Sequence, residues 1–598
     1  MPLIKLLLIP VLLRLGSRLG LAIGFTLLLS QPLTAQEVSQ SPLPRPDRSP
    51  QLELPRINQP PSVQPLPEEV PEPLPPPPLN DLQLPTPAPT EETPGIPQTV
   101  RVERFVLEGS QVFSQAEIDA ATKDFIGREL SFAELLQAAE TITQLYINRG
   151  YITTGAYIPS DRTIQNGIVP VQVVEGSVAP EDIRVRFKEG TKHRLNPEYI
   201  RKRLALATRK PLNREKLLEA LQLLKLNPFI QDIQAELAAS PRLGQSILDV
   251  EVVEGKTFNA VLLLDNGRSP SVGSFRRQLQ VSIGNLTSWS DNLLLFFTNT
   301  NGSNAGDLSY TLPINPRNGT LTFNMGIARS KIIEEPFDLL DIRSRFRYFE
   351  LSFRQPLLQT PTREFALGLT FTREESKATI VDDEIPFPVP GSDFEGRSVA
   401  NVLRFFQDWT RRSEQSVFAL RSQFSFGLPI LGYTDNEEAP DSQFFAWRGQ
   451  AQWARLLAPD TLLLLRSDVQ LADRALIPVE QFGLGGPFNV RGYRQDAILS
   501  DNGILASAEV RIPIWRIPSI NGLLQVAPFV DLGTTWNRSD DPEPDPNTLA
   551  SVGVGLRFQM SDRLSARFDW GQRLIPIGGE KKTLQEKGLY FSLIYNFF

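Results

Sequence analysis

The chain contains no cysteine and only one histidine, His193, among its 598 residues. The absence of cysteine excludes a disulfide framework, a thiol nucleophile and thiolate metal ligands. A single histidine between two basic neighbours, Lys192 and Arg194, makes a poor metal ligand or acid–base group, so we expect it at the surface. The net charge of −7 offers no basic face for nucleic acid. We therefore expect no metal, no cofactor and no nucleic-acid partner.

Long apolar runs are scarce as well, because no run after residue 35 is long enough for a membrane helix. Residues 1–35 predict a secretory signal peptide, since an apolar core at 19–29 follows basic residues and Ala35 is a plausible cleavage edge. The basic residues are Lys5, Arg14 and Arg18. Leu33 is larger than the residue usual at its position, so an uncleaved anchor helix is the alternative. Beyond this segment, any membrane role must come through strands.

Residues 36–98 are rich in proline and include the run Pro75-Pro76-Pro77-Pro78. Proline removes hydrogen-bond donors and favours an extended helix, so we expect no packed core here. The composition predicts a disordered spacer, and a ligand for a periplasmic partner or the cell wall is the alternative. We find no convincing amphipathic helix in this segment, so we do not expect it to plug a pore.

Residues 99–177 predict a small α+β domain with the order strand, helix, helix, strand, strand. Two capping boxes, Ser114 with Glu117 and Ser131 with Glu134, each open a helix. The predicted strands cover 100–107, 153–158 and 168–174.

Residues 178–256 repeat the same order. Strands are predicted at 183–187 and 246–253, and the two helices begin after Asn196 and Asn213. Both segments close on the tripeptide Val-Glu-Gly, at 174–176 and 253–255. The repetition predicts two domains of one kind.

Residues 257–598 predict a membrane β-barrel of sixteen antiparallel strands. Apolar and polar residues alternate most clearly at 461–471, 551–560 and 563–570; in the last, Phe568 and Trp570 face one way while Arg567 and Asp569 face the other. The long polar connections follow odd-numbered strands: 330–344, 375–395, 427–441, 472–502, 534–548 and 573–587. This pattern places both ends of the barrel in the periplasm. A soluble sandwich, the alternative, does not predict it.

One of these connections carries Gly485-Gly486-Pro487-Phe488-Asn489-Val490-Arg491-Gly492-Tyr493, a glycine-rich stretch with a charge. Such a loop must project into water or fold into the lumen. On the thirteenth strand, alternation points Phe529, Asp531 and Gly533 inward. An inward carboxylate needs a partner, and a guanidinium offers a two-pronged fork. We therefore expect Arg491 to pair with Asp531. Whether the pair takes part in gating or only braces a plug stays open.

The sequence ends in an uncharged segment, 588–598, whose apolar residues alternate. Its last aromatic residues are Tyr595, Phe597 and Phe598. An aromatic C-terminal strand resembles the usual signal for barrel insertion, shifted here by one residue. We expect the cell's barrel assembly machinery to read it.

The two α+β segments resemble tandem POTRA domains. Residues 156–159 and 167–176 resemble the first POTRA domain of two-partner secretion transporters in particular. The stretch Val490-Arg491-Gly492-Tyr493 resembles the sixth-loop motif of the POTRA-plus-barrel superfamily, and Phe529, Asp531 and Gly533 resemble its partner motif. Over residues 98–598 the chain resembles the TpsB-type, or haemolysin secretion/activation, transporters.

That resemblance implies an outer-membrane protein with periplasmic POTRA domains, no enzymatic activity, and one secreted TpsA-like client exported unfolded without ATP. The docking residues we expect lie at an exposed sheet edge: Thr153, Thr154, Gly155, Ala156, Tyr157 and Ile158. A barrel assembly factor is one alternative, although such factors carry more POTRA domains. A passive channel is another, although it needs no folded periplasmic domains. We find no phosphate-binding loop or nucleophile elbow that would indicate an enzyme.

Overall fold

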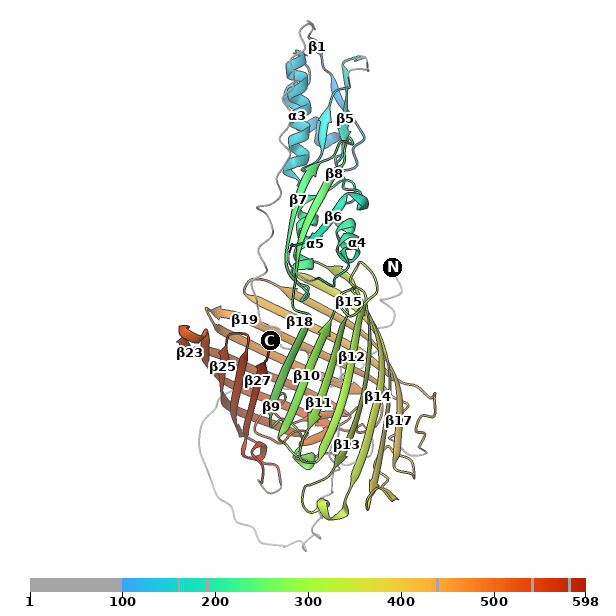
Figure 1. Cartoon of the computed structure of the whole chain (residues 1–598), viewed down its shortest axis with the longest axis vertical. Helices are drawn as coiled ribbons and strands as arrows, with labels where there is room; N and C mark the ends of the chain where they lie inside the picture. The colour runs from blue at the N-terminus through green and yellow to red at the C-terminus, as the bar shows by residue number, and fades with distance from the viewer. Residues whose placement is uncertain are drawn as a thin grey trace, which may run out of the picture. The chain divides into compact units, whose positions relative to one another are not determined.

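A computed structural model describes residues 99–598, apart from 160, 161, 163, 165, 190–192, 437–439, 539–542 and 579–581. The expected signal peptide (1–35) and proline-rich segment (36–98) lie outside the described residues. The expectation that this segment holds no plug helix therefore stays a prediction. The described chain holds two small α+β domains and a β-barrel (Figure 1).

The first α+β domain is built on a three-stranded sheet with the order β2-β5-β4. Its elements are β1 (Val100–Arg101), β2 (Arg104–Glu108), α2 (Gln115–Ala121), β3 (Glu129–Leu130), α3 (Phe132–Asn148), β4 (Gly155–Tyr157) and β5 (Ile168–Val174). Strand β2 runs parallel to β5 and β4 antiparallel to it. Apart from the separate two-residue strands β1 and β3, which the sequence does not predict, the strand and helix order is the predicted one.

Two predicted strands of this domain have the wrong bounds. The single strand expected at 100–107 is two strands, because β1 pairs with β3 whereas β2 pairs with β5, and the chain changes partner between them. The strand expected at 153–158 is only β4, since a turn in which Thr154 N donates to Tyr151 O (3.1 Å) occupies its start. Local alternation shows neither the change of partner nor the turn.

Both predicted capping boxes are present. The backbone N–H of Ser131 donates to Glu134 Oε2 (2.8 Å), and Glu134 N donates back to Ser131 Oγ (3.3 Å). Ser114 and Glu117 form the same arrangement at the start of α2. Helix α3 then buries the face that carries Leu135, Ala138, Ala139, Ile142 and Tyr146. Capping thus sets where the helix begins, and apolar spacing sets which face it buries.

We expect these caps to make the helices sensitive to acid. The pKa of Glu117 is lowered to about 2, first because the backbone N–H of Ser114 donates to it, then through the Ser114 hydroxyl and Arg149. A depressed folded pKa stabilises the fold above the ordinary value of 4.5 and loses that effect as the pH falls toward 2. The circular dichroism signal at 222 nm should therefore weaken over this window.

Glu117→Gln should lower helix stability at pH 7 and flatten that acid transition. Glu140→Gln is the matched control, because Glu140 lies in the middle of α3, away from the helix start, and accepts from its neighbour Gln144 (3.0 Å). Identical pH profiles for Glu117→Gln and the unchanged protein would contradict the role of the cap.

The second α+β domain repeats the plan of the first. Its elements are β6 (Ile183–Phe187), α4 (Pro197–Ala207), α5 (Arg214–Lys225), β7 (Ile230–Ala239) and β8 (Ser246–Glu254). Strand β6 runs parallel to β8 and β7 antiparallel to it, the same pairing as β2, β5 and β4. The side chains of Asn196 and Asn213 cap the two helices as predicted.

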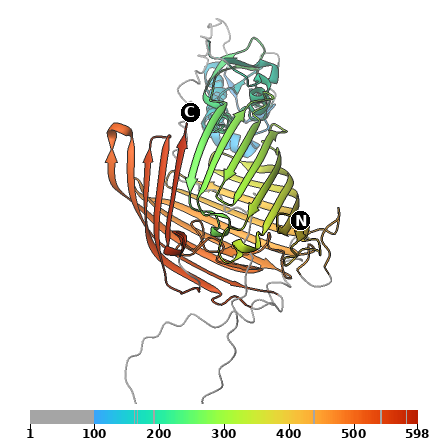
Figure 2. The same cartoon turned by 60° about the horizontal axis from the view of Figure 1, so that its bottom comes forward.

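The barrel is a closed sheet of sixteen long antiparallel strands, drawn in Figures 1 and 2, with the two-residue β16 (Ile385–Pro386) added between two of them. The strands are β9 (Phe258–Asp265), β10 (Arg276–Gly284), β11 (Asn292–Asn299), β12 (Ser303–Pro313), β13 (Thr320–Lys331), β14 (Arg343–Gln359), β15 (Arg363–Ile380), β17 (Arg397–Arg412), β18 (Ser416–Gly427), β19 (Phe445–Ala458), β20 (Thr461–Ala472), β23 (Asn502–Ile517), β24 (Gly522–Trp536), β25 (Thr548–Met560), β26 (Leu564–Arg573) and β27 (Leu589–Asn596). Strand β27 pairs with β9 and closes the barrel.

The two faces of the wall differ as the alternation predicts. On β26, Phe568 and Trp570 are 45% and 44% exposed, whereas Asp569 between them is fully buried. An apolar face directed outward belongs to lipid, and a charged face directed inward belongs to the lumen. No helix among the described residues is long and apolar enough to cross a bilayer.

Two strand ends differ from the prediction. Strand β15 continues to Ile380, inside the expected loop at 375–395, because Glu375 joins Arg347 on β14 (2.7 Å) and Arg397 on β17 (3.2 Å). These cross-strand ion pairs extend the sheet through residues whose polarity predicts a loop. At the C-terminus, β27 ends at Asn596, so Phe597 and Phe598 lie beyond the last strand.

Candidate functional site

The connection between β20 and β23 folds into the lumen. It contains a short hairpin of β21 (Phe482–Leu484) and β22 (Ile498–Ser500). Its apolar side chains form one buried cluster with residues of the wall: Phe482, Leu484, Val490, Tyr493, Ile498, Leu505 and Leu549. A loop that projected into water would expose these side chains. We call residues 473–501 the lumen loop.

Arg491, at the tip of the lumen loop, makes a two-pronged ion pair with Asp531 on β24. Its Nε donates to Asp531 Oδ2 (2.8 Å), its Nη2 to Oδ1 (2.9 Å), and its backbone N–H also donates to Oδ2 (3.1 Å). Asp531 is fully buried and Arg491 is 4% exposed. The Arg491 guanidinium carbon lies 3.4 Å from the centre of the Phe529 ring. The structure therefore brings the loop motif and the strand motif together.

A second carboxylate, Glu509 on β23, also binds Arg491. Glu509 accepts from Arg511 Nε (2.8 Å) and Arg557 Nη2 (3.0 Å) as well. No motif in the sequence identifies this residue. Alternation along β23 would have placed it inward, but only the path of the loop shows that it meets Arg491.

The network continues around the wall onto β26. Arg557 Nη1 donates to Asp569 Oδ1 (2.7 Å), and Arg567 also pairs with Asp569. Arg567 Nη2 then donates to the carbonyl of Pro487 in the lumen loop (2.9 Å). The loop is thus held by a shared charge network on β23, β24, β25 and β26.

Two further residues of the loop motif, Gly492 and Tyr493, contact the wall near the barrel seam, where β27 pairs with β9. Gly492 N donates to the hydroxyl of Tyr590 on β27 (2.9 Å). The hydroxyl of Tyr493 lies 2.8 Å from Ala550 O and 2.9 Å from Ile575 O. These contacts place the loop tip beside the last strands.

Three glycines allow the close approach of the loop. Gly492 has a φ of +98°, and a side chain on Gly533 would begin 2.6 Å from Leu484 Cδ2. A Cβ on Gly571 of β26 would lie 2.7 Å from Gly492 N and 3.0 Å from the Arg491 carbonyl carbon. The motifs identify Gly492 and Gly533, but no sequence signal identifies Gly571.

Comparison with known proteins places this site in a family. A sequence profile of the haemolysin secretion/activation protein ShlB/FhaC/HecB matches residues 244–558, which is more than half of the chain. The chain belongs to this family. A profile of the ShlB-type POTRA domain matches residues 100–176. The chain is therefore a TpsB outer-membrane transporter of two-partner secretion, with periplasmic POTRA domains, and not an enzyme.

Two proteins with similar sequences are named as transporters. The outer membrane transporter CdiB of Escherichia coli (strain 536 / UPEC) is 21% identical over 79% of this chain and 79% of its own length. The heme/hemopexin transporter protein HuxB of Haemophilus influenzae (strain 86-028NP) is 21% identical over 74% of this chain and 78% of its own.

Solved structures agree with the fold. That of CdiB from Escherichia coli matches with a TM-score of 0.65 at 20% identity, over 87% of this chain and 94% of its own. BamA from Haemophilus ducreyi, lacking POTRA domains 1–3, matches at 0.51 and 14% identity, over 84% and 100%. At these identities both likenesses show the fold alone, and the family profile favours secretion over barrel assembly.

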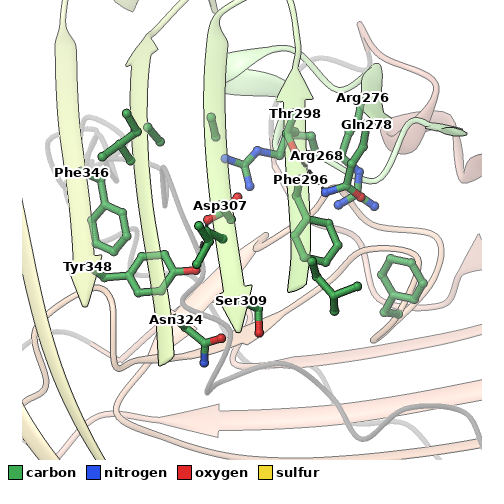
Figure 3. A pocket seen from close by; sticks show the side chains of 16 residues that line it. Arg268, Arg276, Gln278, Phe296, Thr298, Asp307, Ser309, Asn324, Phe346 and Tyr348 are labelled. Atoms are coloured by element: carbon green, nitrogen blue, oxygen red, sulfur yellow. Dashed lines mark hydrogen bonds between the residues drawn. The ribbon is translucent and has the colours of Figure 1, made fainter. Parts of the chain in front are cut away.

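The lumen of this TpsB transporter is not filled on the side of β10–β14 (Figure 3). A cavity of about 540 Å³ lies there, and Phe488 of the lumen loop forms part of its lining. In the same lining, the hydroxyl of Tyr348 donates to Asp307 Oδ1 (3.1 Å). The loop therefore leaves space along this wall.

The structure does not bring the remaining predicted residues to the lumen site. Thr153, Thr154, Gly155, Ala156, Tyr157 and Ile158 lie in the first α+β domain at β4, where Thr154 is buried and Tyr157 is 44% exposed. Tyr595, Phe597 and Phe598 lie at the barrel seam, where the Phe598 ring packs edge-on against Phe258 of β9 with centroids 5.4 Å apart. The predicted residues thus form three separate sites.

Proposed function

We propose that this transporter exports one large TpsA-like protein, unfolded, from the periplasm through the barrel lumen. The observation that supports this most is the buried Arg491–Asp531 pair, which holds a loop inside the barrel. Such a loop closes a pore that must open for a client. The names of CdiB and HuxB describe them as transporters, which agrees with export as the task.

Under this proposal, export needs no ATP. A client that folds outside the cell is removed from the pool of unfolded chains, and this removal draws further chains outward by mass action. A β-helical adhesin or cytolysin fits that requirement, because such a chain folds progressively from the end that emerges first.

The test compares extracellular and outer-membrane proteins with and without the gene. Loss of one large secreted protein, with other barrels intact, is the expected result and identifies the client. A general fall in many outer-membrane barrels would instead indicate an assembly factor, and unchanged secretion would overturn the proposal.

We propose that the client docks on the first POTRA domain at the edge formed by β4. The edge is short, and its Ala156 N–H already donates to the hydroxyl of Thr143 on α3 (2.9 Å). A client strand would have to displace this hydroxyl in order to add to the sheet. The exposed ring of Tyr157 offers an apolar contact beside it.

Ala156→Pro should lower export of the identified client, because it removes the one N–H that a client strand would use. Thr143→Val is the matched variant, since it removes the competing acceptor and keeps the shape of the side chain. We expect Thr143→Val to export at least as much client as the unchanged protein. Normal export by Ala156→Pro, measured as client in the medium, would contradict docking at this edge.

We also propose that outer-membrane lipid surrounds the apolar wall, and that the barrel assembly machinery reads the aromatic end. Phe597 N donates to Ala260 O (3.0 Å), so the end is held against β9 once the barrel is closed. Removal of Phe597 and Phe598 should reduce the amount of barrel in the outer membrane. An unchanged amount of barrel in the outer membrane would contradict the proposal that the assembly machinery recognises these two residues.

A further inference from the structure

The first part of the lumen loop is apolar, although it lies in a polar lumen. Ala475, Leu476 and Ile477 are 4%, 0% and 1% exposed. Leu476 and Ile477 pack in one cluster with apolar residues that β17 and β19 direct inward: Ala400, Val402 and Ala446. Val479 contacts this cluster and also Phe346 and Tyr348 of β14. We call residues 475–480 the base segment. It covers a part of the wall that would otherwise present apolar side chains to water.

The base segment ends in a buried ion pair with the wall. Glu480 pairs with Arg404 of β17, whose side chain is fully buried. Arg404 Nη1 also donates to Thr372 Oγ1 (2.8 Å), and its Nη2 lies 3.8 Å from Glu374 Oε1. Thr372 in turn donates to Glu350 Oε2 (3.1 Å). One guanidinium of the wall thus faces three carboxylates, and Glu480 alone comes from the loop.

Hydrogen bonds join the base segment to the returning end of the loop. Gln470 Nε2 on β20 donates to the carbonyls of Glu480 (2.8 Å) and Asp501 (3.1 Å). Leu476 N donates to Asp501 Oδ1 (2.8 Å). Gln470 and Asp501 therefore connect the two ends of the lumen loop to each other.

Two of the loop's ion pairs, Glu480 with Arg404 and Arg491 with Asp531, lie on different parts of the wall. Arg404 is on β17, the eighth long strand, whereas Asp531 is on β24, the thirteenth, and Tyr590 is on β27, the sixteenth. Figure 2 shows the yellow strands across the barrel from the red ones. A loop fixed at both places must cross the lumen.

We propose that Arg404 and Glu480 are positioning residues that hold the lumen loop across the pore, and that the Arg491 contacts alone do not keep the pore closed. Removal of Glu480 is the clean test of this role. Without the Glu480 carboxylate, Arg404 still has Glu374 and Glu350 near it, so its charge stays balanced within the wall. The loop loses only the ion pair that joined Glu480 to Arg404. Removal of Arg404 would leave three carboxylates in a buried site and would disturb the wall itself.

The experiment uses the full-length chain, which has no cysteine of its own. Ala475→Cys adds one thiol of similar size at a position that is 4% exposed. A membrane-impermeant maleimide should label this thiol slowly, and Glu480→Ala in the same chain should raise the labelling rate at least tenfold. Channel conductance in planar bilayers should rise as well. Glu480→Asp should restore part of the slow labelling, because it restores the charge.

Arg421→Ala is the matched control, since Arg421 lies on β18 and bonds Asp408 of β17 (2.8 Å), and Asp408 keeps Arg354 as a second partner (3.2 Å). Arg421→Ala should change neither the rate of maleimide labelling nor the channel conductance. Wild-type labelling and conductance in Glu480→Ala, or equal increases in both variants, would overturn the proposal. The labelling reports the position of the loop with no client present, so its failure would leave the export function standing.

Discussion

Arg491→Ala is expected to leave the barrel folded in the outer membrane and to lower client export at least tenfold. The substitution removes all three side-chain contacts that hold the loop tip to Asp531 and Glu509. Glu509 keeps Arg511 and Arg557, but Asp531 keeps two neutral donors, the Ser507 hydroxyl (2.6 Å) and the backbone N–H of residue 491 (3.1 Å). Leaving one partner of a buried pair without its counter-charge costs about 3–5 kcal/mol.

That cost affects the loop more than the wall. Strand β24 is paired along its length with β23 and β25, and these backbone ladders do not involve Arg491. The measurement is client in the medium, with heat-modifiable migration of the barrel as the check on folding. Arg491→Lys is the matched variant, because it keeps a charge but loses the planar fork, and we expect intermediate export.

The outcome also decides between the two roles left open by the sequence. If the pair only braces a plug, Arg491→Ala should raise channel conductance and leave export unchanged. If loop position is part of the export cycle, export should fall. Normal export together with normal conductance would remove Arg491 from both roles.

The sequence predicts the parts of this site that depend on one strand or one motif. Alternation along β24 is enough to turn Asp531 inward, and the loop motif supplies Arg491 as its partner. It does not predict Glu509 or Asp569 as members of the same network. Both are visibly inward on their strands, but which inward charges meet depends on the stagger between strands and on the path of the loop.

The base segment shows a different limit. The motif predicts that the part of the connection around Arg491 folds inward, but it does not predict that Leu476 and Ile477 are buried against the inner wall. Residues 473–481 contain no strand or helix, so periodicity carries no information about them. The ion pair of Glu480 with Arg404 joins positions 76 residues apart. Only the closed barrel brings them together.

Gly571→Val is expected to reduce export as strongly as Arg491→Ala, although residue 571 carries no charge and no motif. A Cβ at this position would lie 2.7 Å from Gly492 N. The obstructing atom belongs to the backbone, so no side-chain rotation can relieve the contact, and the loop tip must move away from β26. Gly571→Ala should show the same effect at smaller size. Replacing a glycine inside a strand normally stabilises the strand, so strand propensity does not explain a loss of export.

Gly306→Ala on β12 is the matched control, because its added Cβ would meet nothing nearer than Phe296 O at 4.0 Å. We expect normal export from it. The double variant Gly571→Val with Arg491→Ala shows whether the two substitutions act on export through the same displacement of the loop tip or through independent effects on the barrel. Substitutions that disrupt one contact do not add, whereas distant ones do. If both act by displacing the loop tip, the double variant should export about as much client as Arg491→Ala alone. A further multiplicative loss would place Gly571 outside the loop mechanism and assign its effect to the wall.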